Sequence, residues 1–281
     1  MELEKNSYIS LIRDVTDYYN SDIPELKNIK NNDNLFDLIW CRGLTEEINL
    51  WSYWQGRGAE NPEVMIIGQD FGTCSDENNG FFYEKCVKSS LDERENISSL
   101  YIKRIKSDDK NKTDNMLLRL TKEGLGREYS ADIPSNPKLF MTNACLGYRS
   151  GNKISGGNLS AYIKHDSKYI AKLIDIKRPK VVICLGTDTY FNLISSFVND
   201  KVVIRNIAEG FWESLDNGTN FQDVEINGFT VRFYGVSHAG QNGAINRIRD
   251  KNIPKGSRID TATKLMIGDW KRIGLYLKSI S

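Results

Sequence analysis

Residues 64–70 read Val-Met-Ile-Ile-Gly-Gln-Asp, a short apolar run that ends in glycine and is followed by two polar residues. An apolar run of this length, without alternating polar positions, is typical of a strand buried on both faces of a sheet. Similar runs occupy residues 139–143 and 181–186. Each is followed by a loop or a helical pattern, as parallel strands require. The sequence therefore predicts a three-layer αβα sandwich around a central, mostly parallel sheet.

The flanking segments fit one domain spanning residues 1–281. Apolar and aromatic residues recur at helical spacing over 8–20 and 34–54, so we expect residues 1–60 to form a helical amino-terminal region packed on the sheet. Residues 222–226 and 229–236 flank Asn227-Gly228, a pair that favours a hairpin turn, and an amphipathic helix is expected over about 259–279. Residues 90–115 form a polar insertion, which we interpret as a mobile loop or a partner-binding excursion.

The composition is that of an ordinary globular protein. Hydrophobic residues make up 40% and charged residues 27%, and the formal net charge is +1, so a nucleic-acid surface would have to be a local patch. The five cysteines include no closely spaced pair, which favours reduced thiols. No charged and apolar leader opens the chain, and no apolar run approaches the roughly 18 residues of a membrane span. We expect a cytoplasmic monomer with no membrane partner.

Polar side chains stand directly after the predicted core strands. Gln69 and Asp70 follow the first strand, Asn143 ends the second, and His238 follows the strand of the predicted hairpin. Because the carboxyl ends of parallel strands meet at one edge of a sheet, we expect these side chains to converge there. Each of them also fits a purely structural role, as a helix cap, a loop tie or a packed polar residue.

In this order the motifs resemble the uracil-DNA glycosylase superfamily over roughly residues 60–250. Gly68-Gln69-Asp70 matches the start of the family's first motif, Gly-Gln-Asp-Pro-Tyr, and Asn143 matches its strand-end Asn. His238 matches the His of the family's late His-Pro-Ser loop, and Tyr83 stands where the family has a stacking aromatic. Arg178-Pro179-Lys180 and the strand that follows resemble its third core strand.

The resemblance implies a role for each matched residue. Asp70 would position or polarise the attacking water, and His238 would donate a hydrogen bond to O2 of the departing base. Asn143 would read the Watson–Crick edge of a flipped pyrimidine, and Tyr83 would stack on it. Base-binding positions are therefore expected at Gln69, Phe71, Gly72, Tyr83 and Asn143.

Two departures from the family pattern concern the His loop and the cysteines. Ala239-Gly240 replaces the usual Pro-Ser, and the wedge position, often leucine in the best-known branch, falls near Gln241 or Asn242. One branch holds an iron–sulfur cluster through four cysteines, including a closely spaced pair near the amino terminus, and that pattern is absent here. We therefore predict no cluster, no metal and no cofactor.

A basic segment follows the His loop, and DNA is the expected partner. The loop Ala239–Gly243 carries glycines that suit close approach to a phosphate, so Gly240, Gln241 and Asn242 are expected to bind DNA. Arg247 and Arg249 are expected to neutralise phosphates, together with a basic set of Lys251, Lys255 and Arg258. A solvated basic face is the plainer alternative. His165, in a lysine-containing helix, is expected to be exposed.

These features favour a monofunctional DNA glycosylase that flips out and hydrolyses a pyrimidine nucleotide. In the uracil-specific branch a tyrosine stands where Gly72 stands here, so a C5-modified pyrimidine, such as a modified cytosine of phage DNA, is favoured over uracil, with defence as a possible role. The alternatives are a uracil-DNA glycosylase of base-excision repair, a non-catalytic DNA-binding protein on this scaffold, and a nucleotide-binding enzyme. The last is the weakest, because no Gly-x-Gly-x-x-Gly or P-loop spacing occurs.

Overall fold

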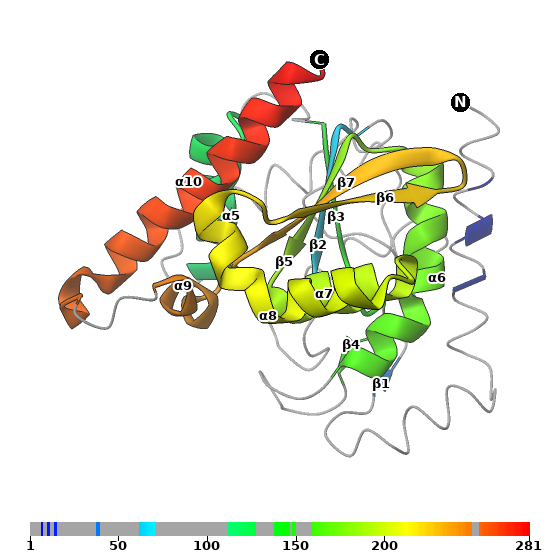
Figure 1. Cartoon of the computed structure of the whole chain (residues 1–281), viewed down its shortest axis with the longest axis horizontal. Helices are drawn as coiled ribbons and strands as arrows, with labels where there is room; N and C mark the ends of the chain where they lie inside the picture. The colour runs from blue at the N-terminus through cyan, green and yellow to red at the C-terminus, as the bar shows by residue number, and fades with distance from the viewer. Residues whose placement is uncertain are drawn as a thin grey trace.

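The structure, a computed structural model, describes residues 7, 10–11, 14–15, 38–39, 62–70, 112–127, 138–146, 148–149, 159–248 and 253–281 (Figure 1). The strands in these ranges are β1 (Leu38–Ile39), β2 (Val64–Gly68), β3 (Leu139–Asn143), β4 (Tyr148–Arg149), β5 (Val181–Leu185), β6 (Phe221–Ile226) and β7 (Phe229–Val236). The helices are α5 (Lys112–Arg119), the π-helix η2 (Leu120–Gly124), α6 (Ser160–Lys177), α7 (Thr187–Phe197), α8 (Lys201–Asn217), α9 (Gln241–Arg247), the 3-10 helix η3 (Lys255–Ser257) and α10 (Arg258–Ser279).

Five strands form the central sheet in the order β3-β2-β5-β7-β6. The first four run parallel to one another, and β6 alone is antiparallel, paired with β7. Every residue of β2 and β5 is buried, because helices cover both faces of these strands. The three predicted core strands and the mostly parallel sheet are thus confirmed.

The β6–β7 hairpin turns at the predicted pair. Asn227 has φ 46° and Gly228 has φ 81°, the two positive values that a two-residue type I′ turn needs. Asn and Gly are the residues that tolerate this backbone best. The hairpin brings β7 back into the sheet beside β5, with its carboxyl end at the same edge as the ends of β2 and β3.

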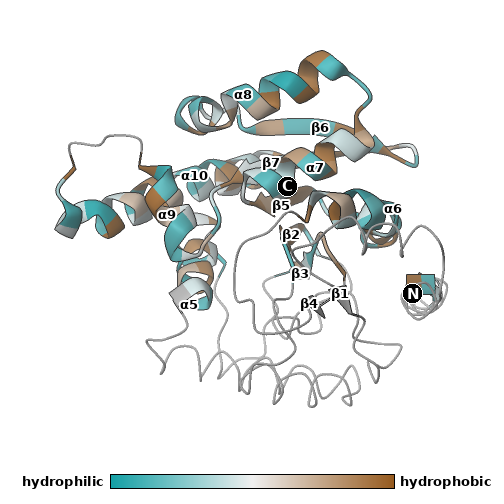
Figure 2. Cartoon of the chain, turned by 90° about the horizontal axis from the view of Figure 1, so that it is seen from below, coloured by the Kyte–Doolittle hydropathy of each residue, from teal (hydrophilic) through white to brown (hydrophobic). Residues whose placement is uncertain are grey.

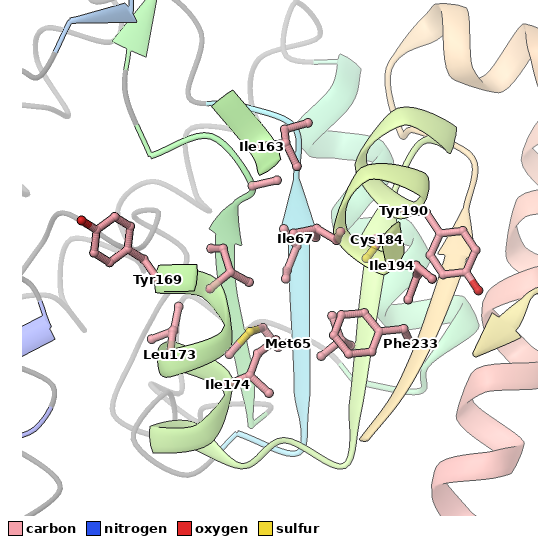
Figure 3. Close-up of a cluster of buried hydrophobic side chains, with 14 of the residues drawn as sticks. Met65, Ile67, Ile163, Tyr169, Leu173, Ile174, Cys184, Tyr190, Ile194 and Phe233 are labelled. Atoms are coloured by element: carbon pink, nitrogen blue, oxygen red, sulfur yellow. The ribbon is translucent and has the colours of Figure 1, made fainter. Parts of the chain in front are cut away.

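Two apolar cores separate the three layers. One lies between the sheet and α6, α7 and α8, and contains side chains such as Met65, Ile174 and Phe233 (Figure 3). The other lies between the opposite face of the sheet and the helices α5, η2, α9 and α10, where Trp270 is fully buried. Figure 2 shows α5, α9 and α10 on one side of β2 and β3, with α6 on the other. The predicted three-layer αβα sandwich is confirmed.

The amino-terminal region departs from the prediction at one point. Residues 7, 10–11 and 14–15 are helical, and Leu11 and Val15 are buried in the first core. Leu38–Ile39, expected in a helix, instead forms the strand β1, which pairs antiparallel with β4. Two adjacent apolar residues fit the repeat of a helix as well as that of a strand. The partner strand lies more than a hundred residues away in the sequence, so local spacing could not reveal the pairing.

The predicted polar insertion is described only at its end. Residues 90–111 lie outside the described ranges, and residues 112–115 begin helix α5 rather than belonging to a loop. The final helix, expected over about 259–279, is α10.

At the amino-terminal edge of the sheet, Glu63 joins three segments through its carboxylate. Its two oxygens accept from the guanidinium of Arg127 and from Lys180 Nζ, the latter at 3.0 Å. The hydrogen bond from Arg127 is the main reason that the pKa of Glu63 falls from 4.5 to about 2, with Lys180 adding to it against the opposing effect of burial. Charge pairing thus ties β2, β5 and the segment after η2 at the edge opposite the polar strand ends.

Replacing Glu63 by Gln is expected to lower the free energy of unfolding by about 2 kcal/mol at pH 7, allowing for the partial exposure of the three side chains. Because the folded-state pKa of Glu63 is depressed, its contribution is full above the unfolded pKa of 4.5 and is lost as the pH falls towards 2. Urea denaturation at several pH values checks this. The difference between wild type and E63Q should shrink below pH 4.5, whereas E209Q, at an exposed position of α8, should match wild type throughout.

Candidate active site

Four parallel strands end at one edge of the sheet, and polar residues follow three of them. Asp70 follows β2, Asn143 ends β3, and His238 follows β7. The chain leaves β2 towards β3 and leaves β5 towards β7, so the strand order reverses between β2 and β5. Ligands of open α/β sheets bind at such a reversal, outside the carboxyl ends of the strands. The topology places these strand ends at one edge of the sheet, as the sequence predicted.

Asn143 lies directly over Gly68, its register partner on β2. A Cβ atom at position 68 would stand 2.3 Å from Asn143 Oδ1, so only glycine leaves room for this amide. Beyond the strand ends, Ala144 N–H donates to Gly68 O at 2.8 Å and Cys145 N–H donates to Gln69 O at 2.9 Å. The backbone around Asp70 and the amide of Asn143 are therefore held together by the extended β2–β3 ladder.

His238 is held as a neutral imidazole with its proton on Nε2. The backbone N–H of Gly240 donates to Nδ1 at 3.0 Å, so Nδ1 is an acceptor and Nε2 carries the hydrogen. Burial lowers the pKa of His238 below its usual 6.5, and the negative charge of Asp70 opposes that shift. Two properties follow: His238 offers an Nε2–H donor at neutral pH, and Asp70 is close enough for its charge to act on the ring.

Glycines surround His238 on several sides. A Cβ at Gly243 would stand 2.2 Å from His238 O, so the first turn of α9 presses on the His backbone. A Cβ at Gly240 would stand 3.0 Å from His238 Nδ1 and 3.3 Å from Thr113 Oγ1. Gly186, at the end of β5, has φ 95° and lies beside His238 Cβ. Side chains larger than hydrogen at positions 240 and 243 would therefore crowd the ring or the backbone of His238.

Thr113, on the first turn of α5, is a neighbour of the His loop that the sequence did not indicate. Its Oγ1 would stand 3.3 Å from a Cβ atom at position 240, so the hydroxyl lies next to Gly240. About 125 residues separate the two segments, and nothing in the composition of residues 112–115 distinguishes Thr113 from a surface residue. Only the packing of α5 beside α9 brings it to the site.

The remaining predicted base-binding and DNA-binding residues divide into described and undescribed ones. Gln69 is half-buried at the same edge as Asp70, and Gly240 is half-buried beside His238. Gln241 and Asn242 are exposed on the first turn of α9. Outside the described residues lie the predicted Phe71, Gly72, Tyr83 and Arg249.

Arg247 does not lie where a phosphate contact would need it. Its side chain is 3% exposed, and its guanidinium binds both oxygens of Asp269 at 2.7 and 3.0 Å and Asp216 at 2.7 Å. Asp269 is itself 2% exposed and also accepts from Arg272 at 2.6 Å. The prediction for Arg247 is corrected: it anchors α9 to α10 and to the end of α8, because a buried charge must be paired within the protein.

His165 was expected to be exposed, and it is not. Its side chain is 11% exposed, and Nδ1 lies 2.8 Å from Oδ1 of the fully buried Asp166. The lysines at 164 and 168 flank it on the exposed face of α6, which is why the local composition suggested solvent.

Among the described residues, no group of three His, Cys, Asp or Glu side chains gathers in a way that could hold a metal ion. Cys145 and Cys184 are buried and form no disulfide bond, and burial raises the pKa of Cys184. No described helix combines the length and apolarity that crossing a membrane takes.

A family model described as the uracil DNA glycosylase superfamily matches residues 55–224, more than half of the chain. The chain belongs to the uracil DNA glycosylase superfamily. Membership in this superfamily supports DNA glycosylase activity and DNA binding in general terms. No curated protein matches the sequence.

The superfamily match covers β2, β3 and β5 and ends within β6, so it includes Asp70 and Asn143 but not His238. Strand β7, whose residues 232–236 pair in parallel with β5, brings the His loop to the edge where β2 and β3 end. The topology of this chain, and not the family match, brings His238 to the same edge of the sheet as Asp70 and Asn143.

Proposed function

We propose that the protein is a monofunctional DNA glycosylase that flips out a pyrimidine nucleotide and hydrolyses its bond to the sugar. The observation that carries this proposal is a neutral, Nε2-protonated His238 at the same edge of the sheet as Asp70, close enough for the charge of that carboxylate to act on the ring. Breaking an N-glycosidic bond leaves positive charge on the sugar and negative charge on the base. A carboxylate and an N–H donor, fixed on opposite sides of that bond, stabilise both charges.

Each group has a distinct part in this reaction. Asp70 faces the sugar and orients the attacking water, while His238 donates its Nε2–H to the oxygen of the departing base. A neutral donor suits this part, because it need not give up its proton completely to stabilise the anion. Asn143 carries both a donor and an acceptor, as recognition of a pyrimidine edge requires.

We propose that the segments around these groups bind the DNA. Gly240, Gln241 and Asn242 follow His238 on the side that is exposed, and we propose that they contact the DNA backbone beside the flipped nucleotide, with Arg249 following. Gln69, Phe71 and Tyr83 complete the base pocket in this proposal. No lysine stands in the described segments directly after β2, β3, β5 and β7, namely residues 69–70, 144–146, 186–188 and 237–243, so hydrolysis is favoured over lyase chemistry.

The favoured base is a C5-substituted pyrimidine, and this part of the proposal rests on Gly72. A tyrosine ring beside C5 excludes bulky bases in the uracil-specific branch, whereas glycine has no side chain that could occupy that volume. An unfilled apolar volume weakens the binding and positioning of a small base. Modified cytosines of phage DNA fill it, and Asn143 can accept from a cytosine amino group. A role in defence against such phages follows from that substrate, whereas uracil release would indicate repair.

Incubation with matched oligonucleotides tests the proposal. The duplexes carry cytosine, 5-hydroxymethylcytosine, glucosylated 5-hydroxymethylcytosine, uracil or thymine at one position, and released bases are detected by mass spectrometry. We expect release of a C5-substituted base, and we expect G72Y to suppress that release while leaving any uracil release in place. If wild type releases only uracil, and G72Y has the same selectivity, the proposed C5-substituted substrate is wrong. Binding without release of any base would favour the non-catalytic alternative.

A further inference from the structure

Asp166 is a fully buried carboxylate on α6 that has no part in the proposed reaction. Its side chain is 0% exposed. Oδ2 accepts the backbone N–H of Leu146 at 2.8 Å, and Oδ1 lies 2.8 Å from His165 Nδ1. Because an ionised carboxylate only accepts hydrogen bonds, His165 Nδ1 carries the hydrogen of this contact.

A buried charge at this position needs a reason, because α6 packs on the sheet mainly through apolar residues. Ile163, Ile170 and Ile174 fill the first core from the same helix. Removing a carboxylate from water is strongly unfavourable unless its hydrogen bonds are made inside the protein. The charge of Asp166 acts on the neighbouring Tyr169. Burial is the main cause that raises the pKa of Tyr169 to about 12, and Asp166 is the next. An apolar residue would pack here at lower cost but would not hold Leu146.

Leu146 belongs to the short loop that follows Asn143. The N–H groups of Ala144 and Cys145 are bound by backbone oxygens of β2 and its extension, at 2.8 and 2.9 Å. The N–H of Leu146 is bound by Asp166 at 2.8 Å. The thiol of Cys145 also faces the oxygen of Leu159, just before α6, at 3.9 Å. The loop after Asn143 is therefore held on one side by β2 and on the other by α6.

We propose that Asp166, oriented by His165, is a positioning residue for Asn143. By fixing the loop at Leu146, it keeps the Asn143 amide over Gly68 with its donor and acceptor in a constant orientation towards the base. The inference rests on the proposed function of Asn143 in reading the pyrimidine edge. Its consequence is that Asp166, without touching substrate, controls which base is accepted.

Replacing Asp166 by Leu or by Asn tests this positioning. D166L removes the acceptor for Leu146 N–H and keeps the number and branching of the side-chain heavy atoms, whereas D166N keeps one oxygen that can accept it. Because misplacement of a reacting group by about 1 Å can cost on the order of 10² in rate, D166L should lower the excision rate of the preferred base by that order. The rate ratio between preferred and non-preferred bases should fall with it. D166N should lie between D166L and wild type, and the Kd for DNA should stay within about twofold of wild type in both variants, since no DNA contact is removed.

The matched control is D175L, on the same helix. Asp175 pairs with Arg178 and Asn227 and is 30% exposed, away from the strand ends. The same substitution there should leave the base ratio at its wild-type value. If D175L lowers the ratio as much as D166L does, the effect is one of general stability and the positioning role is overturned. If D166L does not fold, the comparison of D166N with wild type decides the same question.

A second measurement separates this inference from the proposed glycosylase reaction. The side-chain amide resonance of Asn143 in the free protein reports its environment whether or not any base is released. We expect that resonance to shift or broaden in D166L and to stay at its wild-type position in D175L. An active wild type whose base ratio and Asn143 resonance are both unchanged in D166L would overturn the positioning role alone. Absence of release by wild type, with the resonance shifted in D166L, would overturn the reaction and the control of base choice but keep the loop contact.

Discussion

Replacing Asp70 by Asn, or His238 by Ala, is expected to slow base release by on the order of 10²–10³ while DNA binding persists. Each change removes a charge or donor that acts mainly in the transition state, when the sugar becomes positive and the base negative. Single-turnover release of the preferred base gives the rate, and titration of labelled DNA gives the Kd. The matched control is D260N, at an exposed position on the first turn of α10, which should retain the wild-type rate.

The pH dependence of the same reaction tests the protonation state of His238. The neutral ring is the proposed active form, and burial holds its pKa below 6.5. The rate should therefore fall on acidification with a midpoint below pH 6.5, as the ring becomes charged and the Gly240 N–H contact to Nδ1 is lost. A rate that is already halved at pH 6.5 would mean that the His238 ring is not desolvated in the working enzyme.

In the substitution experiment, full activity of both D70N and H238A would contradict the proposed mechanism.

The strands and their polar ends were predictable because the signals are local. A strand buried on both faces must be apolar throughout, and a two-residue turn must accept positive φ, so β2, β5 and Asn227-Gly228 could be identified without a tertiary structure. Parallel strands then bring their carboxyl ends together by topology alone. Asp70, Asn143 and His238 could be grouped on that basis.

The residues that hold the site in shape were not predictable, because their partners are distant in sequence. The charge of Arg247 indicated solvent or DNA, yet its carboxylate partners come from α8 and α10. The two lysines near His165 indicated an exposed face, but the His165 side chain is 11% exposed and its ring lies against the buried Asp166. Thr113 approaches the His loop from a helix that no motif marks. The partner of a buried polar side chain is set by the tertiary structure, so it cannot be read from the residue type alone.

Replacing Arg247 by Leu is expected to lower the free energy of unfolding by about 3 kcal/mol, near the lower end for breaking a buried ion pair. Asp269 would keep its contact with Arg272 at 2.6 Å but lose both hydrogen bonds from Arg247 in a site where it is 2% exposed. Lysine is not expected to substitute well, because it cannot present the planar pair of donors that binds both carboxylate oxygens. Urea denaturation measures the change, and R205A, at an exposed position of α8, is the control that should match wild type.

The double variant R247L/D269L sharpens the test, because replacing both partners of a buried pair by apolar residues often restores stability. We expect it to be more stable than R247L alone.

The same proteins also decide between the two roles considered for Arg247. A phosphate contact would flatten the salt dependence of DNA binding by about one unit of slope and leave unfolding unchanged. The buried pairs predict the reverse for a variant that remains folded: reduced stability with an unchanged salt slope. Since α9 presses its first turn on the backbone of His238, loosening this anchor should also slow base release in R247L, and the double variant should recover part of that rate.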